Sequence, residues 1–254
     1  MEIRFDERVV LVTGASTGIG AAVARAFAAA GARVVVHYNR SQDAAEGVAR
    51  DIETSGGTAL LLKADVTDPR QLRALVEQTM ERFGRIDILI NNAGSLIIRQ
   101  AVADMPDETY REIVDVNVTA VFQTCKLVIP IMQRQGHGNI INVTSIAARN
   151  GGGGGSILYA SSKAAVSTFT RGLAKELAGS NIRVNAVSPG TILTPFHERF
   201  TRPEQMQATI ATIPMGRAGT PEECVGAFVF LASDALSGYV TGQIIEVNGG
   251  QLMP

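Results

Sequence analysis

The 254-residue chain is 46% apolar and 19% charged, the composition of a folded protein with a full hydrophobic core. Its 23 basic and 24 acidic residues nearly cancel, so we expect neither nucleic acid nor an anionic membrane surface as a partner. The N-terminal segment lacks the apolar core of a secretory signal and the two cysteines are far apart, which predicts a cytoplasmic protein. Three dispersed histidines predict no metal site.

Short apolar runs alternate with helical patterns along the whole chain. Parallel strands need crossover helices, so this alternation predicts one α/β domain, with a parallel sheet covered by helices on both faces. The predicted strands are 8–13, 33–38, 59–65, 86–91, 139–145, 181–190 and 243–250. The predicted helices are 21–31, 42–55, 68–84, 106–135 in two pieces, and 157–178.

A glycine-rich turn follows the first strand and opens the first helix. Such a turn lets the backbone approach a pyrophosphate, which then lies against the positive end of the helix. The sequence TGASTGIG has no Gly-Lys-Ser/Thr, so it is not a P-loop, and its glycine spacing alone also fits a plain tight turn. Its place after a strand favours a dinucleotide site, with contacts from Gly14, Ser16, Thr17, Gly18, Ile19 and Gly20.

Tyr159 and Lys163 are four residues apart in a predicted helix and therefore share one face. A free tyrosine has a pKa of about 10, and a fixed cation beside it favours the phenolate, so the lysine would make the tyrosine a usable acid or base. Ser145 can hold a substrate oxygen against the tyrosine. The Tyr-x-x-x-Lys spacing by itself also fits a half-buried aromatic residue beside a solvated lysine.

The motifs together resemble the short-chain dehydrogenase/reductase family over essentially the whole chain. The resemblance rests on TGASTGIG, Asn91-Asn92-Ala93-Gly94, Asn117, Ser145, the Tyr159 and Lys163 pair, and Pro189-Gly190, in that order. It implies a single Rossmann domain, doubly wound, with a seven-stranded parallel sheet and a nicotinamide cofactor. It also implies that Tyr159 donates the proton in carbonyl reduction, Lys163 lowers the tyrosine pKa and holds the ribose, Ser145 orients the substrate and Asn117 holds a relay water.

The same resemblance assigns smaller cofactor contacts. It places Asp65 and Val66 at the adenine edge, and the segment from Pro189 to Ile192 beside the nicotinamide. The contacts it implies beyond the glycine turn are Asp65, Val66, Asn92, Ala93, Gly94, Tyr159, Lys163, Pro189, Gly190, Ile192 and Thr194. The residues from about 192 to 215 are expected to form a mobile substrate lid within the single domain.

The choice between NADP and NAD depends on the residues after the second strand. An NAD site usually has a carboxylate there, and no carboxylate occurs between Gly31 and Gln42. Arg40 offers a planar donor group suited to a 2′-phosphate, with Asn39 and Ser41 as neutral donors. These residues predict NADP, with NAD possible.

The interval between Ser145 and Tyr159 is slightly longer than is commonest in the family, and the excess falls in Gly151 to Gly155, which suggests a mobile loop. Thr144 is a rival for the role of Ser145, although the two side chains would point to opposite faces of the strand. Ser156 is expected to cap the tyrosine helix.

Several functions stay open on the sequence. The leading reading is NADP-dependent interconversion of a ketone or aldehyde and an alcohol, and its variants are a 3-oxoacyl-thioester reductase and a sugar or polyol dehydrogenase. The thioester variant would use a basic docking patch, for which Arg134, Arg171 and Lys175 are candidates. A non-catalytic NADP-binding regulator is the alternative from another class. The family resemblance further implies a homotetramer or homodimer, paired through helices 106–135 and 157–178 and the last strand.

Overall fold

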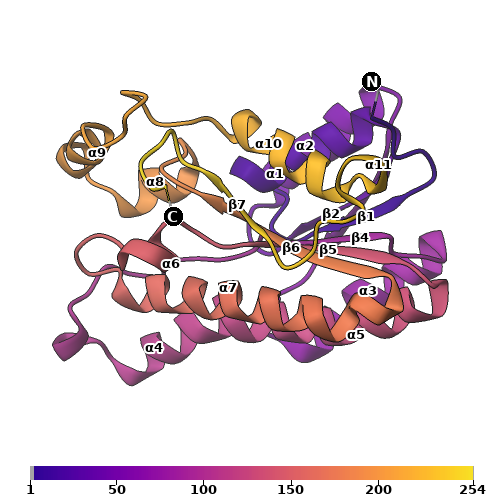
Figure 1. Ribbon diagram of the computed structural model, residues 1–254, viewed down its shortest axis with the longest axis horizontal. Helices are drawn as coiled ribbons and strands as arrows, with labels where there is room; N and C mark the ends of the chain where they lie inside the picture. Colours follow the sequence, from indigo (N-terminus) through magenta and orange to yellow (C-terminus); the bar gives the residue numbers. More distant parts are fainter. Residues whose placement is uncertain (1–2, 254) are drawn as a thin grey trace.

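The computed structural model describes residues 3–253 as three layers, a parallel sheet between two sets of helices (Figure 1). The sheet has seven strands in the order β3-β2-β1-β4-β5-β6-β7, and every neighbouring pair is parallel. The strands are β1 Val9–Val12, β2 Arg33–Tyr38, β3 Thr58–Lys63, β4 Ile88–Asn91, β5 Gly138–Val143, β6 Ile182–Pro189 and β7 Ile244–Val247. This architecture confirms the predicted fold class.

The sheet is buried on both faces because alternate side chains of its strands enter two different cores. On β1, Val10 and Val12 pack with α1, α2 and α10, whereas Val9 and Leu11 pack with α3, α5 and α7. Figure 1 shows these two sets of helices above and below the sheet. The first set is α1 Gly18–Ala29, α2 Gln42–Thr54 and α10 Pro221–Ala232, and the second is α3 Pro69–Phe83, α5 Ala120–Gln135 and α7 Ile157–Leu177.

The remaining helices are short and lie around the carboxyl ends of the strands or at the chain's turns. They are η1 Val102–Asp104, α4 Asp107–Val114, η2 Asp115–Thr119, α6 Ala147–Asn150, η3 Ala178–Ser180, α8 Pro195–Phe200, α9 Pro203–Ile210 and α11 Asp234–Ser237. The two pieces predicted for 106–135 are one continuous helical run, because the π-helical turn η2 joins α4 to α5. Helices α8 and α9 fall in the segment predicted as the substrate lid.

Within the described residues, the run Asp107–Gln135 is long and apolar enough to cross a membrane by length and composition alone. Core helices of soluble proteins meet the same test. In this fold the run packs against β5, α3 and α7, and Val128 and Met132 are fully buried in the core. Its outer face carries Tyr110 and Phe122, which are 49% and 46% exposed.

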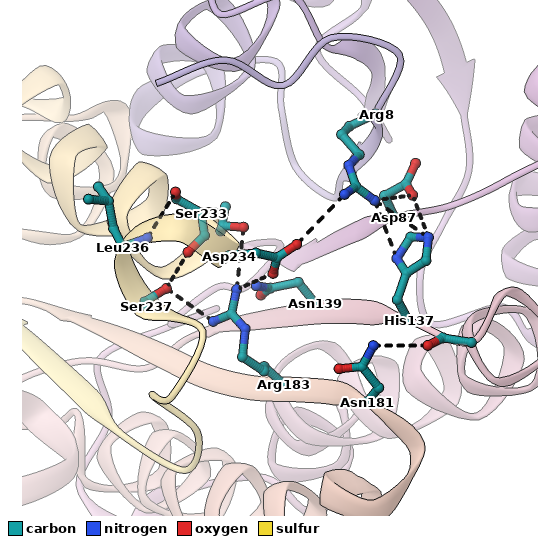
Figure 2. A network of polar contacts seen from close by, with 12 residues as sticks. Arg8, Asp87, His137, Asn139, Asn181, Arg183, Ser233, Asp234, Leu236 and Ser237 are labelled. Atoms are coloured by element: carbon teal, nitrogen blue, oxygen red, sulfur yellow. Dashed lines mark hydrogen bonds and ion pairs between the residues drawn. The ribbon is translucent and has the colours of Figure 1, made fainter. Parts of the chain in front are cut away.

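A polar network closes the sheet at the amino ends of its strands (Figure 2). Asp87 is 1% exposed and accepts hydrogen bonds from Arg85 and from the N–H of Val9, and Arg8 also bonds to it. Burial alone would raise the pKa of Asp87, but these donors and charges hold it below its usual value. Arg183 similarly ties the start of β6 to Asp234, Ser237 and the carbonyl of Leu231. The network therefore fixes the amino ends of the strands and leaves their carboxyl ends to the connecting loops.

Candidate active site

A large cleft lies at the carboxyl ends of the strands, beside the junction of β1 and β4. Strand order reverses there, since the chain runs outward from β1 to β3 and returns to β4 on the other side of β1. Open α/β sheets bind ligands at such a point. The cleft encloses about 850 Å³, and of the predicted site residues only Gly20 and Asn117 do not line it.

The glycine turn at one end of the cleft is held by hydrogen bonds from the two neighbouring strands. Gly14 and Gly18 have φ values of 65° and 54°, which side-chain-bearing residues rarely adopt. The Asn92 amide donates to the carbonyls of Thr13 and Gly14, both at 2.9 Å. A Cβ on Gly20 would lie 2.3 Å from the Gly14 oxygen, so Gly20 serves the packing of α1 against the turn.

His37 is a functional residue that the sequence analysis did not identify. Its Nδ1 accepts a hydrogen bond from the Gly14 N–H at 2.9 Å, which leaves Nε2 to donate to the Ala64 carbonyl at 3.0 Å. Burial lowers the pKa of His37, which keeps the ring neutral as this pair of bonds requires. His37 therefore orients the glycine turn from β2, a role that follows only from tertiary contact.

The residues expected at the 2′-phosphate lie together in the cleft, directly after β2. Arg40 is exposed on the cleft wall with Asn39 and Ser41 beside it. Asp65 lines the same cleft, and its carboxylate accepts hydrogen bonds from the N–H and the hydroxyl of Thr67. Burial alone would raise the pKa of Asp65, but hydrogen bonds from Thr67 and Asn39 and the charge of Arg40 lower it.

As predicted, the structure brings Ser145, Tyr159 and Lys163 together in the cleft. The Ser145 hydroxyl lies near enough to the Tyr159 phenol to lower its pKa, and the Lys163 ammonium lies 5.7 Å from the tyrosine ring centre. Lys163 is 3% exposed, and its Nζ donates to the Val143 carbonyl at 3.0 Å. Thr144 is not a rival for Ser145, because its hydroxyl is turned away and donates to the Val187 carbonyl.

Asn117 lies directly behind this group, fully buried in the π-helical turn η2. Its amide donates to the carbonyls of Ser95 and Ile113 and accepts from the Ser95 N–H. A Cβ on Gly94 would lie 2.8 Å from Asn117 Oδ1 and 3.0 Å from Lys163 Nζ, so only glycine fits between them. The structure thus brings Asn117 beside Lys163, and the relay water stays a prediction.

The tyrosine and lysine pKa values differ from the sequence-based expectation. Burial raises the pKa of Tyr159 to about 12, against a smaller lowering by the Ser145 hydroxyl. Burial also lowers the pKa of Lys163 to about 8. The predicted depression of the tyrosine pKa by Lys163 is therefore wrong for the cofactor-free protein, because burial is the largest influence on the phenol and favours its neutral form. Tyr159 keeps its proton and is set up as an acid.

Helix α8 covers the catalytic tyrosine. The Phe196 ring packs on Tyr159 with their centres 5.6 Å apart, and Phe200 packs on Phe196 at 5.1 Å. Within the run Gly151 to Gly155, Gly155 is needed for close packing, since a Cβ there would lie 2.9 Å from the Gln100 nitrogen, whereas a Cβ on Gly151 or Gly154 would meet nothing within 4 Å. Ser156 stands at the N-terminus of α7, but its hydroxyl bonds to the Gly153 carbonyl, so the predicted side-chain cap is absent.

Comparisons with known proteins agree with this geometry. The family model described as enoyl-(acyl carrier protein) reductase matches residues 14–251. The 3-oxoacyl-[acyl-carrier-protein] reductase of Synechocystis is 41% identical over 250 residues, which are 97% of each chain. The chain belongs to the short-chain dehydrogenase/reductase family. It is an NAD(P)-dependent oxidoreductase that acts on CH–OH groups and their carbonyl counterparts.

Two solved structures in the family share its fold closely. A 7α-hydroxysteroid dehydrogenase complexed with NADH and 7-oxo glycochenodeoxycholic acid has a TM-score of 0.92 and 38% identity, covering 98% of this chain and 96% of its own. A putative NAD(P)-dependent gluconate 5-dehydrogenase from Beutenbergia cavernae with bound NADP has a TM-score of 0.91 and 36% identity, covering 99% of both chains. Family members of this shape therefore include proteins crystallised with either dinucleotide.

Replacing Tyr159 by phenylalanine tests the catalytic assignment in this dehydrogenase/reductase. The change removes the phenol proton but keeps the ring that packs against Phe196, so we expect kcat for carbonyl reduction to fall about 10³-fold with the melting temperature unchanged. Initial rates of NADPH oxidation and thermal unfolding measure both. Tyr239→Phe, on a fully exposed ring, is the matched control. Near wild-type turnover in Tyr159→Phe would refute the assignment.

The pH dependence of reduction follows from the same pair of residues. Reduction needs the protonated phenol, which a Tyr159 pKa of about 12 maintains across the neutral range. Lys163, with a pKa of about 8, is charged below that pH and neutral above it. We expect the reduction rate to be steady below about pH 8 and to fall above it, because Lys163 then loses the charge that stabilises the phenolate formed by Tyr159, with apparent values that belong to the pair. A reduction rate that climbs from about pH 7 to 9, with hydride transfer rate-limiting, would contradict this.

Proposed function

We propose that the protein is an NADP(H)-dependent reductase of a ketone or aldehyde, running in reverse as an alcohol dehydrogenase. One observation carries the proposal: the cleft that holds Ser145, Tyr159 and Lys163 is large enough for a dinucleotide and is also lined by Arg40. The segment after β2 that contributes Arg40 has no carboxylate before Gln42. The cleft thus joins a proton donor to a site for the phosphate that distinguishes NADP from NAD.

The residues of the cleft fit a dinucleotide. Gly14 and Gly18 leave the backbone of the turn bare beside the first turn of α1, where a pyrophosphate would lie. Lys163, next to Gly94, would hold the nicotinamide ribose, and the Pro189 to Ile192 segment would lie beside the nicotinamide. Thr194 lies against Gly18 of the glycine turn and would be near the phosphates. When bound, the cofactor supplies the hydride that is added to the carbonyl carbon.

The chain's own residues then complete the reduction. The Ser145 hydroxyl, already near the phenol, holds the substrate oxygen beside Tyr159. The phenol donates its proton to that oxygen as negative charge develops there, and the alcohol leaves with one hydride on carbon and one proton on oxygen. The Lys163 ammonium stabilises the phenolate that remains. A proton then returns to Tyr159 by way of the relay water that Asn117, beside Lys163, is expected to hold.

A 3-oxoacyl-thioester reductase is the second candidate. Two observations favour it, the 41% identity to the Synechocystis reductase and the exposure of Arg134, Arg171 and Lys175 on the outer faces of α5 and α7. A panel of small ketones, aldehydes, sugars and acetoacetyl-thioesters, followed by NADPH consumption, separates the candidates. A regulator that binds the cofactor without turnover would oxidise it with none of them.

We further propose that the protein is a homodimer or homotetramer, paired through the outer face of α4, α5 and α7. Tyr110, Phe122 and Ile157 are each more than two-fifths exposed on these helices, and a two-fold interface uses one patch twice.

We expect sedimentation velocity at micromolar concentration to give at least a dimer. Phe122→Glu places two charges in such an interface and should shift the protein toward monomer, whereas a monomeric wild type would refute the pairing.

Arg40→Asp tests the cofactor preference. An arginine–phosphate contact is worth about 1.5–3 kcal/mol, so its loss should lower the kcat/KM ratio of NADPH to NADH by about ten- to a hundredfold. The new carboxylate also accepts the ribose hydroxyl of NADH, which lowers the ratio further. Fluorescence titration of both reduced cofactors gives the same comparison without turnover. Arg50→Gln, at an exposed position on α2 outside the cleft, is the control. An unchanged ratio in Arg40→Asp would show that Arg40 does not read the phosphate.

A further inference from the structure

The substrate half of the cleft holds a cation that the catalytic mechanism does not use. Arg99 lies in the loop after β4 and lines the cleft together with α8 and α9. Its Nε donates to the Phe200 carbonyl at 2.5 Å, and its Nη1 donates to the Gly154 carbonyl at 3.2 Å. The guanidinium is thus fixed between the lid and the glycine run, and three of its five N–H groups remain for a ligand.

Arg99 has no anionic partner within the described part of the chain, where no carboxylate oxygen lies within 4.0 Å of its guanidinium. Glu112 and Asp115 also line the cleft, but both are exposed, so water screens their charge. Burial lowers the pKa of Arg99 with no compensating carboxylate. A partly desolvated and unpaired cation in a ligand cleft is unfavourable until an anion arrives.

Of the two groups described around Arg99, His197 stays neutral and Arg199 adds positive charge. His197 lies near enough that burial and the charge of Arg99 both lower its pKa, which leaves the imidazole neutral. Arg199 stacks over the Phe200 ring at 5.1 Å, and its exposed position puts a second positive charge at the mouth of the cleft. An incoming anion therefore meets attraction from the rim to Arg99.

Arg99 lines the same cleft as the reacting groups Ser145 and Tyr159. One short helix contacts both ends of this part of the cleft, because Phe196 of α8 packs on Tyr159 and Phe200, four residues further along, binds Arg99 through its carbonyl. Four helical residues rise about 6 Å, so α8 places the two contacts about one helical turn apart. A substrate bound in this cleft can therefore meet Arg99 as well as the catalytic residues.

We propose that the carbonyl substrate carries a carboxylate that Arg99 binds while Ser145 and Tyr159 hold the carbonyl, so that the enzyme reduces short oxo acids. This deepens the proposed function and depends on it. A single guanidinium with a free pair of N–H groups matches the planar, singly charged carboxylate better than a doubly charged phosphate ester. Arg99 would then have two roles, since it also ties the lid to the glycine run.

Matched acids and esters separate these roles. The probes are 4-oxopentanoate, 5-oxohexanoate and 6-oxoheptanoate with their methyl esters, assayed by NADPH oxidation. We expect the wild type to favour at least one acid over its ester by about tenfold or more in kcat/KM, since an unpaired charge on the enzyme penalises the ester. Arg99→Gln should lower kcat/KM for that acid by about 10- to 100-fold more than for its ester, because both substrates lose the lid contact and only the acid loses the ion pair. Arg99→Lys should recover part of the loss.

Arg202→Gln is the matched control, because Arg202 lies in the same lid, is exposed and does not line the cleft. Its helix-starting contact uses the backbone N–H, which the substitution keeps. Binding is followed independently by the melting temperature of Tyr159→Phe saturated with NADPH, which the preferred acid should raise and its ester should not.

Each outcome decides one point. Equal rates on acid and ester in the wild type, or an Arg99→Gln protein that loses both alike, would show that Arg99 is a lid tether only. The carboxylate proposal is equally overturned if small neutral ketones or thioesters are reduced while no oxo acid is turned over or raises the melting temperature. If no carbonyl compound of either panel oxidises the cofactor, the proposed reductase function itself fails.

Discussion

The whole cleft depends on four hydrogen bonds that join the ends of β1 and β4. The Thr13 hydroxyl accepts from the N–H groups of Asn92 and Ala93, and the Asn92 amide donates to the Thr13 and Gly14 carbonyls. These bonds span nearly eighty residues of sequence and hold the glycine turn against the next residues, Ala93 and Gly94. Because Gly94 in turn separates Asn117 from Lys163, the cofactor end and the proton-transfer end share one rigid frame.

Within that frame the protein holds two ionisable groups that are partly or wholly withdrawn from water, since Lys163 is buried and Tyr159 is half-buried. Lys163 donates a hydrogen bond to a backbone carbonyl, and the Ser145 hydroxyl lies beside Tyr159. Neither partner carries a charge, so burial dominates both pKa values and pushes them toward the neutral forms, phenol and amine. Such a site is less stable than an apolar one of the same shape, but its dipoles are already in place when charge develops on the substrate oxygen.

Much of this arrangement is readable from sequence because it depends on local patterns. The strand and helix alternation and the glycine turn were predicted from periodicity and residue type, and the catalytic residues from a motif that has Ser145 just after β5 and Tyr159 and Lys163 one turn apart on α7. The π-helical turn at Asp115–Thr119 was missed, since it exists because the Asn117 side chain binds the Ile113 carbonyl, which no hydrophobic period records. The roles of His37 and of the glycine run were missed for a similar reason, as each depends on a segment distant in sequence. The tyrosine pKa was predicted in the wrong direction because burial depth is a property of the folded chain.

The two halves of the cleft differ in how their chemistry is encoded. Phosphate recognition uses backbone N–H groups, so it needs glycine at a few positions and leaves a motif. The proposed substrate recognition uses side chains on α8 and on the loop after β4, which Arg99 joins through its contact with Phe200, as it joins the glycine run through Gly154. Those contacts join a lid to a catalytic wall through backbone carbonyls, which any residue type can provide, so they leave no sequence motif. A family resemblance therefore fixes the reaction, whereas the substrate has to be inferred from which charges the folded lid leaves without a partner.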